Sequence, residues 1–288
     1  LARGEHLGAF ALTEADSGSD AGALRTRAEP DGDGWKITGA KQWITNGRYA
    51  GTFLVFARTD FDTAGARGVS AVILDADHVR ITRDEEKLGL NSSATNDLVI
   101  EGAAAGGARL LHSGDTGSRV GRRRVGGGRT GIAAKGVGMG EAAEDGAREY
   151  AKQRQTFGKR ISEHQAIQFK LADMTTEIDA ARLLVYRAAT LKDRGEPVTE
   201  AGAKAKLFAS SVAQRHTGEA IPILGGYGYT REFPAARYHR VSQLPQPHHG
   251  PTPLPPPAPP PTPPRLHPPP PVPAPPPPPA PRAPPPRR

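Results

Sequence analysis

The sequence predicts an α+β fold in which a β-rich segment precedes a helical one. Between Phe10 and about Gly102, short runs of β-branched and aromatic residues are separated by turn signals. From about Arg129 onward, the apolar residues recur every three or four positions, as on one side of a helix. Several short strands without intervening helices favour a β-barrel or a sandwich. Long helices with short connections favour a bundle.

The β-rich segment is predicted from three strand candidates and two turns. Residues 35–38 (Trp-Lys-Ile-Thr) alternate apolar and polar side chains, as in a half-buried strand. Residues 52–57 and 69–74 are mostly apolar runs rich in β-branched or aromatic residues. Residues 31–34 (Asp-Gly-Asp-Gly) and Asn46-Gly47 are typical of tight turns.

Three long helices are predicted in the second half of the chain. The first covers about 130–154 and the third covers 199–221. The second begins at a capping-box pattern formed by Ser162 and Gln165, and Gly195 ends it. Its apolar stripe consists of Ile167, Leu171, Met174, Ile178, Ala181, Val185 and Ala188.

Two segments fit neither pattern. Residues 106–128 are rich in Gly and Arg and lack apolar periodicity, so we expect an irregular linker there. Residues 241–288 contain no acidic and no aromatic residue, and they cannot bury enough apolar surface to offset the entropy of ordering. We therefore expect a disordered or polyproline II tail. Of the 30 prolines in the chain, all but four follow Arg240; the exceptions are Pro30, Pro197, Pro222 and Pro234.

Composition excludes several classes of function. The chain has no cysteine, which rules out disulfides, thiolate catalysis and zinc–thiolate sites. The net charge of +8 comes partly from the tail, and its basic residues are not interleaved with aromatics, so we expect no nucleic-acid partner. No apolar run approaches the roughly 20 residues of a membrane span. A cysteine-free chain suits a reducing compartment, and we expect a cytoplasmic protein.

Two short strings in the β-rich segment are the strongest site candidates. Residues 11–20 read Ala-Leu-Thr-Glu-Ala-Asp-Ser-Gly-Ser-Asp, and residues 41–47 read Lys-Gln-Trp-Ile-Thr-Asn-Gly. Hydroxyl groups beside glycines let backbone N–H groups approach a phosphate or a ring carbonyl. Trp43 and Thr45 share one face if the segment is a regular strand. Taken alone, the first string also fits a polar surface loop, and the second fits a strand with one core tryptophan.

Two further strings lie at predicted helix ends. The first, at 154–158 (Arg-Gln-Thr-Phe-Gly), carries a planar guanidinium suited to pyrophosphate, although an arginine there also complements the helix dipole. The second, at 224–228 (Leu-Gly-Gly-Tyr-Gly), permits close backbone approach to a ligand, although a helix stop explains it equally well. His164 and His216 lie on predicted helix surfaces or near helix ends, and neither is assigned a catalytic role. No histidine pair has metal-ligand spacing, so no metal site is predicted.

The four strings, in this order, resemble the acyl-CoA dehydrogenase family over about 7–97 and 129–240. Family members have an N-terminal helical domain, a middle β-barrel and a C-terminal four-helix bundle, bind FAD and usually form homotetramers. The resemblance implies that the first domain is almost wholly missing from this chain. The implied division is a remnant of that domain at 1–6, the barrel at 7–105, the linker at 106–128, an incomplete bundle at 129–240 and the tail at 241–288.

The resemblance also implies roles for individual residues. Thr13 matches the hydrogen-bond partner of the flavin pyrimidine edge, Trp43 packs by the ring, and Thr45 matches the residue that reaches N5. Ser19 matches the serine near the FAD phosphates and the thioester, and Arg129 matches a substrate-binding arginine. The other matched cofactor positions are Phe10 and Leu12 beside the flavin, Arg154, Thr156 and Phe157 on the FAD of a neighbouring subunit, and Gly225 and Gly226 beside the adenosine diphosphate.

The implied reaction is the α,β-dehydrogenation of an acyl-CoA thioester in fatty acid metabolism, with electrons passed to an electron-transfer flavoprotein. In most members a glutamate that follows the Gly-Gly-Tyr-Gly loop removes the α-proton. No Asp or Glu follows Arg240 here, and the alternative family position, beside the arginine matched by Arg129, is Gly128. We therefore assign no catalytic base and expect weak or absent turnover. The alternatives are a non-catalytic FAD- or CoA-binding remnant and an interaction protein that uses its proline-rich tail.

Overall fold

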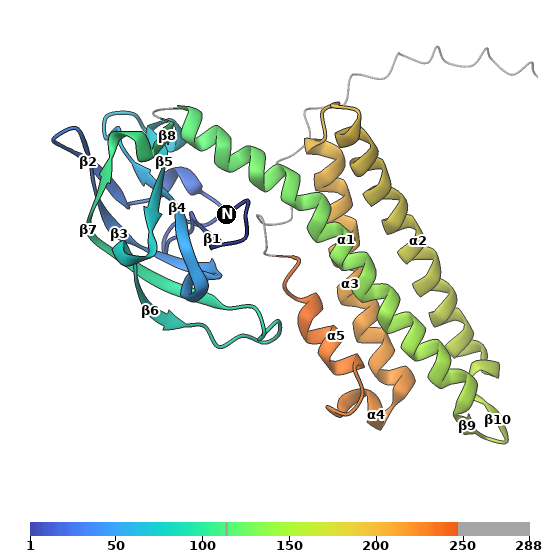
Figure 1. Cartoon of the computed structure of the whole chain (residues 1–288). Helices are drawn as coiled ribbons and strands as arrows, with labels where there is room; N and C mark the ends of the chain where they lie inside the picture. Colours follow the sequence, from blue (N-terminus) through green and yellow to red (C-terminus); the bar gives the residue numbers. More distant parts are fainter. Residues whose placement is uncertain (113–114, 247–288) are drawn as a thin grey trace, which may run out of the picture. The chain divides into compact units, whose positions relative to one another are not determined.

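The computed structural model describes residues 1–112 and 115–246, and Figure 1 shows its two kinds of architecture. The β-rich part forms one mixed sheet of eight strands. Along the sheet the strands follow the order β6-β7-β3-β2-β4-β5-β8, and β1 pairs in parallel with β4. The strands are β1 (Leu7–Ala11), β2 (Arg27–Asp31), β3 (Gly34–Thr45), β4 (Ala50–Arg58), β5 (Val69–Asp75), β6 (Arg80–Asp84), β7 (Thr95–Gly106) and β8 (Leu110–His112).

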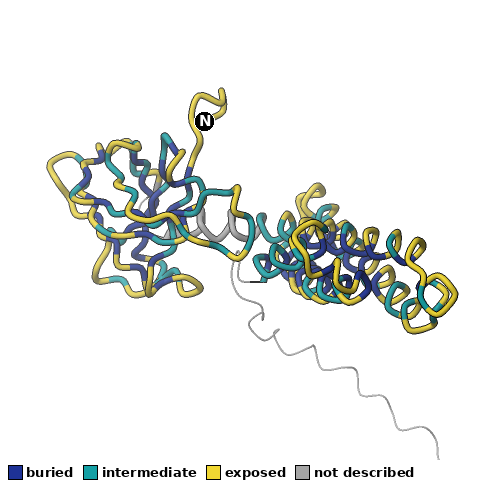
Figure 2. The backbone as a smooth tube through the Cα atoms, turned by 90° about the horizontal axis from the view of Figure 1, so that it is seen from below, coloured by how far each residue is buried: buried dark blue, intermediate teal, exposed yellow. Residues whose placement is uncertain are grey.

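Strand β4 is buried on both faces from Phe53 to Ala57, which explains the apolar run there. Phe53 and Val55 belong to the main core cluster of the sheet. Phe56 points to the other face, where it packs with Leu24 and Val69. Because successive side chains alternate between faces, a strand buried on both sides is apolar at every position. Figure 2 shows the buried segments inside the sheet.

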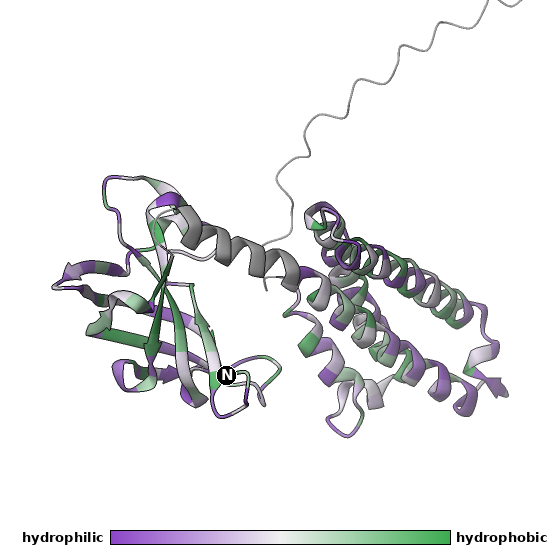
Figure 3. Ribbon diagram, turned by 45° about the horizontal axis from the view of Figure 1, so that its top comes forward, coloured by the Kyte–Doolittle hydropathy of each residue, from purple (hydrophilic) through white to green (hydrophobic). Residues whose placement is uncertain are grey.

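The helical part contains three long helices and two short ones. The elements are α1 (Asp115–Gln153), a hairpin of β9 (Gln155–Thr156) and β10 (Lys159–Arg160), α2 (Gln165–Asp193), α3 (Thr199–Leu224), α4 (Gly226–Tyr229) and α5 (Ala235–Ser242). The predicted stripe of α2 is confirmed: from Met174 to Ala188 its members are buried, and Ile167 and Leu171 are half-buried. They face small side chains of α1 and α3, such as Ala133 and Ala209. Figure 3 shows hydrophobic residues along the helices.

The expectation of an irregular linker at 106–128 is wrong for most of these residues. Residues 110–112 form β8, and α1 begins at Asp115. Extending a helix costs far less than nucleating one, so the strongly periodic half of α1 can propagate backward through glycines. Each glycine costs only about 1 kcal/mol relative to alanine, and no proline interrupts this stretch.

Two boundaries also differ from the prediction. The prediction of a capping box at Ser162 and Gln165 is wrong, because α2 starts at Gln165. A short 3₁₀ turn precedes it, and there Glu163 Oε1 accepts from the Arg160 N–H at 3.1 Å. Residues 241–246, expected in the tail, form the end of α5 (to Ser242) and a turn that packs on α3, where Gln214 Nε2 donates to Gln243 Oε1 at 2.6 Å. The rest of the expected tail, 247–288, lies outside the described residues. No helix in the described ranges combines the length and apolarity that a membrane crossing requires.

Candidate functional site

The first candidate site lies where β1 and β3 end. The chain leaves β1 at Ala11, and Leu12 and Thr13 follow beside β3. The backbone N–H of Gln42 donates to the Thr13 carbonyl at 2.9 Å, which fixes the two strings side by side. We call Phe10, Leu12, Thr13, Trp43 and Thr45 the β-domain cluster.

Trp43 has an unusual backbone conformation for a bulky residue in a strand. Its φ is 60°, in the left-handed region, and the β3–β7 register shifts between Lys41 and Ile44. This bulge interrupts the alternation between Lys41 and Ile44, which are both buried, but it leaves Trp43 and Thr45 on the same exposed side, as expected. Ile44 is buried between exposed Trp43 and Thr45, and the Trp43 side chain is 55% exposed. A large apolar side chain held outward by a costly backbone conformation is typical of a binding surface.

The other members of this region mix structural and surface roles. Phe10 is half-buried and contacts the Phe56 ring at a centroid distance of 4.9 Å, so part of its side chain belongs to the core. Ser19 is exposed in a loop that is held by its neighbours: Ser17 Oγ donates to the Asp20 carbonyl at 2.7 Å. The hydroxyl of Ser19 is thus presented on an ordered loop rather than packed.

The second candidate site is a pocket of about 780 Å³ in the helical part. It lies between the β9–β10 hairpin, the start of α2 and the loop after α3. We call it the helical pocket. The structure brings together here five of the six residues that the sequence singled out in this half, namely Arg154, Thr156, Phe157, Gly225 and Gly226, but not Arg129.

Local backbone conformations shape both rims of the helical pocket. Phe157 and Gly158 have φ values of 52° and 80°, so they form a tight hairpin turn that leaves the Phe157 side chain 96% exposed. On the opposite rim Gly225 has a φ of 61°, which a glycine adopts without strain. The Arg154 carbonyl accepts from Ile161 N–H at 2.9 Å, which closes the hairpin at its base.

His164 is a pocket residue that the sequence did not single out for binding. It lines the helical pocket, and its ring lies 6.2 Å from the Phe157 ring. Its Nε2 atom is buried and has no hydrogen-bond partner among the described residues. An unpaired ring nitrogen on a residue that lines a pocket is a candidate group for a ligand there. Only the tertiary placement reveals this, because a histidine at a helix start carries no distinctive local signal.

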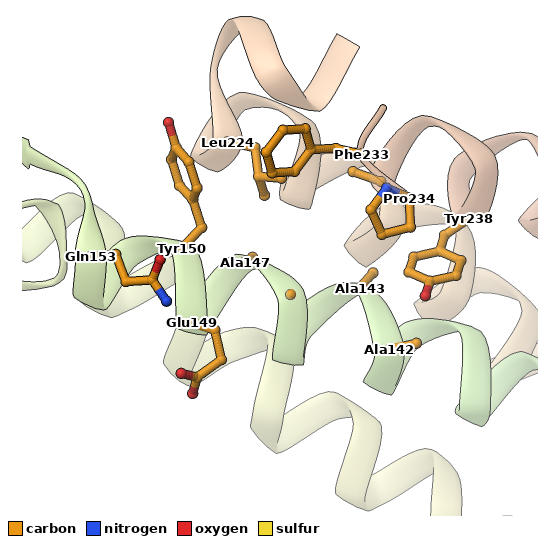
Figure 4. Close-up of a pocket in the computed structure, with 12 residues that line it drawn as sticks. Ala142, Ala143, Ala147, Glu149, Tyr150, Gln153, Leu224, Phe233, Pro234 and Tyr238 are labelled. Atoms are coloured by element: carbon orange, nitrogen blue, oxygen red, sulfur yellow. The ribbon is translucent and has the colours of Figure 1, made fainter. Parts of the chain in front are cut away.

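A smaller pocket of about 210 Å³ adjoins this region and shares the walls formed by Tyr150 and Leu224 (Figure 4). Phe233 and Tyr238 close one side of it, and small side chains of α1 such as Ala143 line the other. Its surface is mostly apolar, and none of the predicted site residues lines it. The carboxylate in its lining, Glu149, pairs with Lys152 at 2.7 Å.

Two further positions bear on the predicted site. Pro222, inside α3, lines the helical pocket, and because proline lacks an N–H it offers only its carbonyl, which accepts from Gly225 N–H at 3.1 Å. Arg129 is half-buried on α1 and is not among the residues lining either of the two pockets. Its expected contact with substrate therefore stays a prediction.

Replacing Gly228 by alanine is expected to destabilise the protein by about 1–3 kcal/mol, because the added carbon cannot be accommodated. A Cβ at Gly228 would lie 2.3 Å from the Ile221 carbonyl oxygen. The matched control is Gly226→Ala, where a Cβ meets no atom within 4 Å. Urea unfolding of the two variants measures the difference. Equal losses of stability would contradict the tight approach of this loop to α3.

Comparison with known proteins gives one consistent result for both halves. Residues 9–103 match the acyl-CoA dehydrogenase middle domain, and residues 115–253 match the acyl-CoA dehydrogenase C-terminal domain. The chain is 40% identical over 252 residues to a short-chain specific acyl-CoA dehydrogenase of Clostridium acetobutylicum, covering 87% of this chain and 66% of that protein. It is 41% identical to the mitochondrial short-chain enzyme of Bos taurus, covering 86% of this chain and 60% of that protein.

Solved structures show the same likeness. Butyryl-CoA dehydrogenase from Megasphaera elsdenii superimposes with a TM-score of 0.83 at 41% identity, over 85% of this chain and 65% of that one. An acyl-CoA dehydrogenase from Geobacillus kaustophilus gives a TM-score of 0.83 at 32% identity, over 86% and 66%. The chain thus spans slightly less than two thirds of the length of these relatives.

Proposed function

Because this chain belongs to the acyl-CoA dehydrogenase family, we propose that it binds FAD and carries the framework for α,β-dehydrogenation of an acyl-CoA thioester. The observation that carries the proposal is the convergence of two separately predicted strings, 154–158 and 224–228, on the helical pocket. The exposed Trp43 beside Thr13 supplies the second half of the argument.

The residues present fit a flavin dinucleotide in their chemistry. The helical pocket combines a guanidinium at Arg154, a hydroxyl at Thr156 and an unpaired ring nitrogen at His164, and these groups suit a pyrophosphate with its sugars. The β-domain cluster offers an outward-facing indole at Trp43 and a hydroxyl at Thr45, which suit a flat ring with polar edges. By resemblance, the pocket would hold the dinucleotide of a neighbouring subunit.

Bound FAD supplies the acceptor for the hydride that leaves the β-carbon of the thioester. The chain's own contribution is to orient the two reactants and exclude water. In this proposal Thr13 donates to the pyrimidine edge, Trp43 fixes the ring plane and Ser19 lies near the thioester. Arg154 neutralises the phosphates.

Removal of the α-proton requires a base, and here the chain departs from its family. Neither position at which the family places its glutamate carries a carboxylate: Gly128 stands at one, and no acidic residue follows Arg240. A general base contributes about 10²–10⁴ in rate. We therefore propose a flavin-binding chain with weak dehydrogenation, and a non-catalytic FAD- or CoA-binding protein is the limiting case.

Partners follow from the same proposal. The substrate is an acyl-CoA, the electron acceptor is an electron-transfer flavoprotein, and the family implies a homotetramer in which Arg154 meets the FAD of a neighbour. Bacterial relatives such as the Clostridium enzyme favour a cytoplasmic location. Docking of the proline-rich tail into aromatic grooves of another protein is the second candidate function; loss of a partner on deletion of 241–288 would favour it.

Absorbance spectroscopy of the purified full chain tests the proposal. We expect FAD to bind and give a yellow protein, and butyryl-CoA to bleach the bound flavin slowly or not at all. A folded protein that stays colourless after incubation with FAD would refute the proposed function. Rapid bleaching would show instead that another group acts as the base.

A further inference from the structure

The sheet contains a fully buried lysine whose three N–H bonds are all used. Lys41 on β3 has 0% exposure. Its Nζ donates to Glu14 Oε1 at 2.8 Å, to the Phe56 carbonyl at 2.6 Å and to the Leu12 carbonyl at 3.1 Å. One ammonium therefore connects β3 and β4 to the segment that follows β1.

Glu14 completes the network on the other side. Its Oε1 also accepts from Thr26 N–H at 3.0 Å and from Thr26 Oγ1 at 2.6 Å, and its Oε2 accepts from Arg25 N–H at 2.6 Å. Burial acts to raise the pKa of Glu14, but the Lys41 charge and these hydrogen bonds outweigh it and hold the pKa below its usual value. Burial lowers the pKa of Lys41 to about 8, although Glu14 opposes the shift.

Stability alone is a weak reason for such a pair. Removing two charges from water is expensive, and well-packed apolar residues of similar volume are often as stabilising or more so. What the pair does provide is geometry, because each hydrogen bond fixes one backbone segment to another. The segments it joins are the ones that carry the β-domain cluster: Glu14 directly follows Thr13, and Lys41 stands two residues before Trp43.

We propose that Glu14 and Lys41 are a positioning pair that holds the ring-facing segments 12–13 and 42–43 at the separation that FAD binding needs. Lys41 holds the Leu12 carbonyl directly. One residue on, the Gln42 N–H holds the Thr13 carbonyl. The backbone directly before Trp43 is therefore held in place, and Trp43 follows it in a left-handed conformation. The inference rests on the proposed FAD binding but concerns residues that touch no cofactor.

The test uses the full chain in a Trp35→Phe background, so that Trp43 is the single remaining tryptophan of the two. The double variant Glu14→Gln/Lys41→Met removes both charges together and leaves no buried charge unpaired. We expect it to remain folded while the Kd for FAD rises about tenfold. We also expect weaker quenching of Trp43 emission in its FAD complex. A pair with a purely structural role would shift the unfolding midpoint and leave both readouts unchanged.

The matched control is the exposed pair Arg80–Glu101 at 2.8 Å in the same sheet. Its neutralisation by Arg80→Met/Glu101→Gln is expected to leave the Kd and the quenching at parental values. If the double variant does not fold, Thr26→Val removes only the Thr26 hydroxyl that donates to Glu14 Oε1, keeps both charges paired and is expected to raise the Kd to a smaller extent. A folded variant with parental Kd and quenching overturns the inference. A parent that binds no FAD overturns the proposed function instead.

Discussion

Replacing Gly128 by glutamate is expected to accelerate reduction of bound FAD by butyryl-CoA by about 10²–10⁴-fold, the usual contribution of a general base. Gly128 lies on α1 beside Arg129 and is half-buried. The resemblance places the glutamate of some family members at this position. The parent has no carboxylate at either family position, so in the proposed reaction we expect the loss of the α-proton to be the slow step. A carboxylate supplied there should remove that obstacle while leaving the affinity for FAD unchanged.

Stopped-flow bleaching of the flavin measures this effect, and Gly138→Glu is its control. Gly138 lies on the same helix, is exposed and has open space for a side chain. Both variants replace a poor helix former, so they gain similar stability. Only the change at Gly128 should alter the rate. Equal rates in the parent and both variants would mean that α1 does not present residue 128 to the substrate.

The bundle was the part of the fold most open to prediction from sequence. The stripe from Ile167 to Ala188 is a local property, since residues three and four apart share a face whatever surrounds the helix. The apolar run of β4 likewise predicted a strand from local sequence alone. The start of α1 could not be predicted from the sequence, because helix propagation through the glycines before Arg129 depends on stability supplied further along the helix.

Most residues proposed for the candidate site were chosen from the sequence, but their geometry could not be predicted. The family resemblance singled out Arg154 and Gly225, yet only the packing of the hairpin against the end of α3 puts them in one pocket. The bulge at Trp43 could not be predicted, because a positive φ in a tryptophan has no local sequence signal. His164 was passed over for the same reason: its unpaired nitrogen is a product of tertiary packing.

Replacing Arg154 by glutamine is expected to weaken FAD binding by about 10- to 150-fold, the usual range for a hydrogen bond to a charged group. Arg154 lies at the mouth of the helical pocket and its side chain is exposed. Among the described side chains, those of residues 1–111 and 128–246, no carboxylate forms an ion pair with its guanidinium within 4.0 Å. The N–H donors of the Arg154 guanidinium are therefore available to a phosphate. Glutamine keeps much of the length of the side chain and removes the charge and the planar fork.

Titration of the apoprotein with FAD measures the loss of affinity. Two further variants separate the effect of the charge from the effect of the bidentate geometry and from the effect of removing any nearby positive charge. Arg154→Lys retains the charge without bidentate geometry and should fall between the parent and the glutamine variant. Arg194→Gln, just beyond the end of α2, removes an equal charge away from the pocket and should bind like the parent. Because exposed charges are screened, raising the salt concentration should narrow the gap between Arg154→Gln and the parent. A gap that is absent at low salt would mean that the helical pocket does not hold the pyrophosphate, and the cofactor would then depend on the β-domain cluster alone.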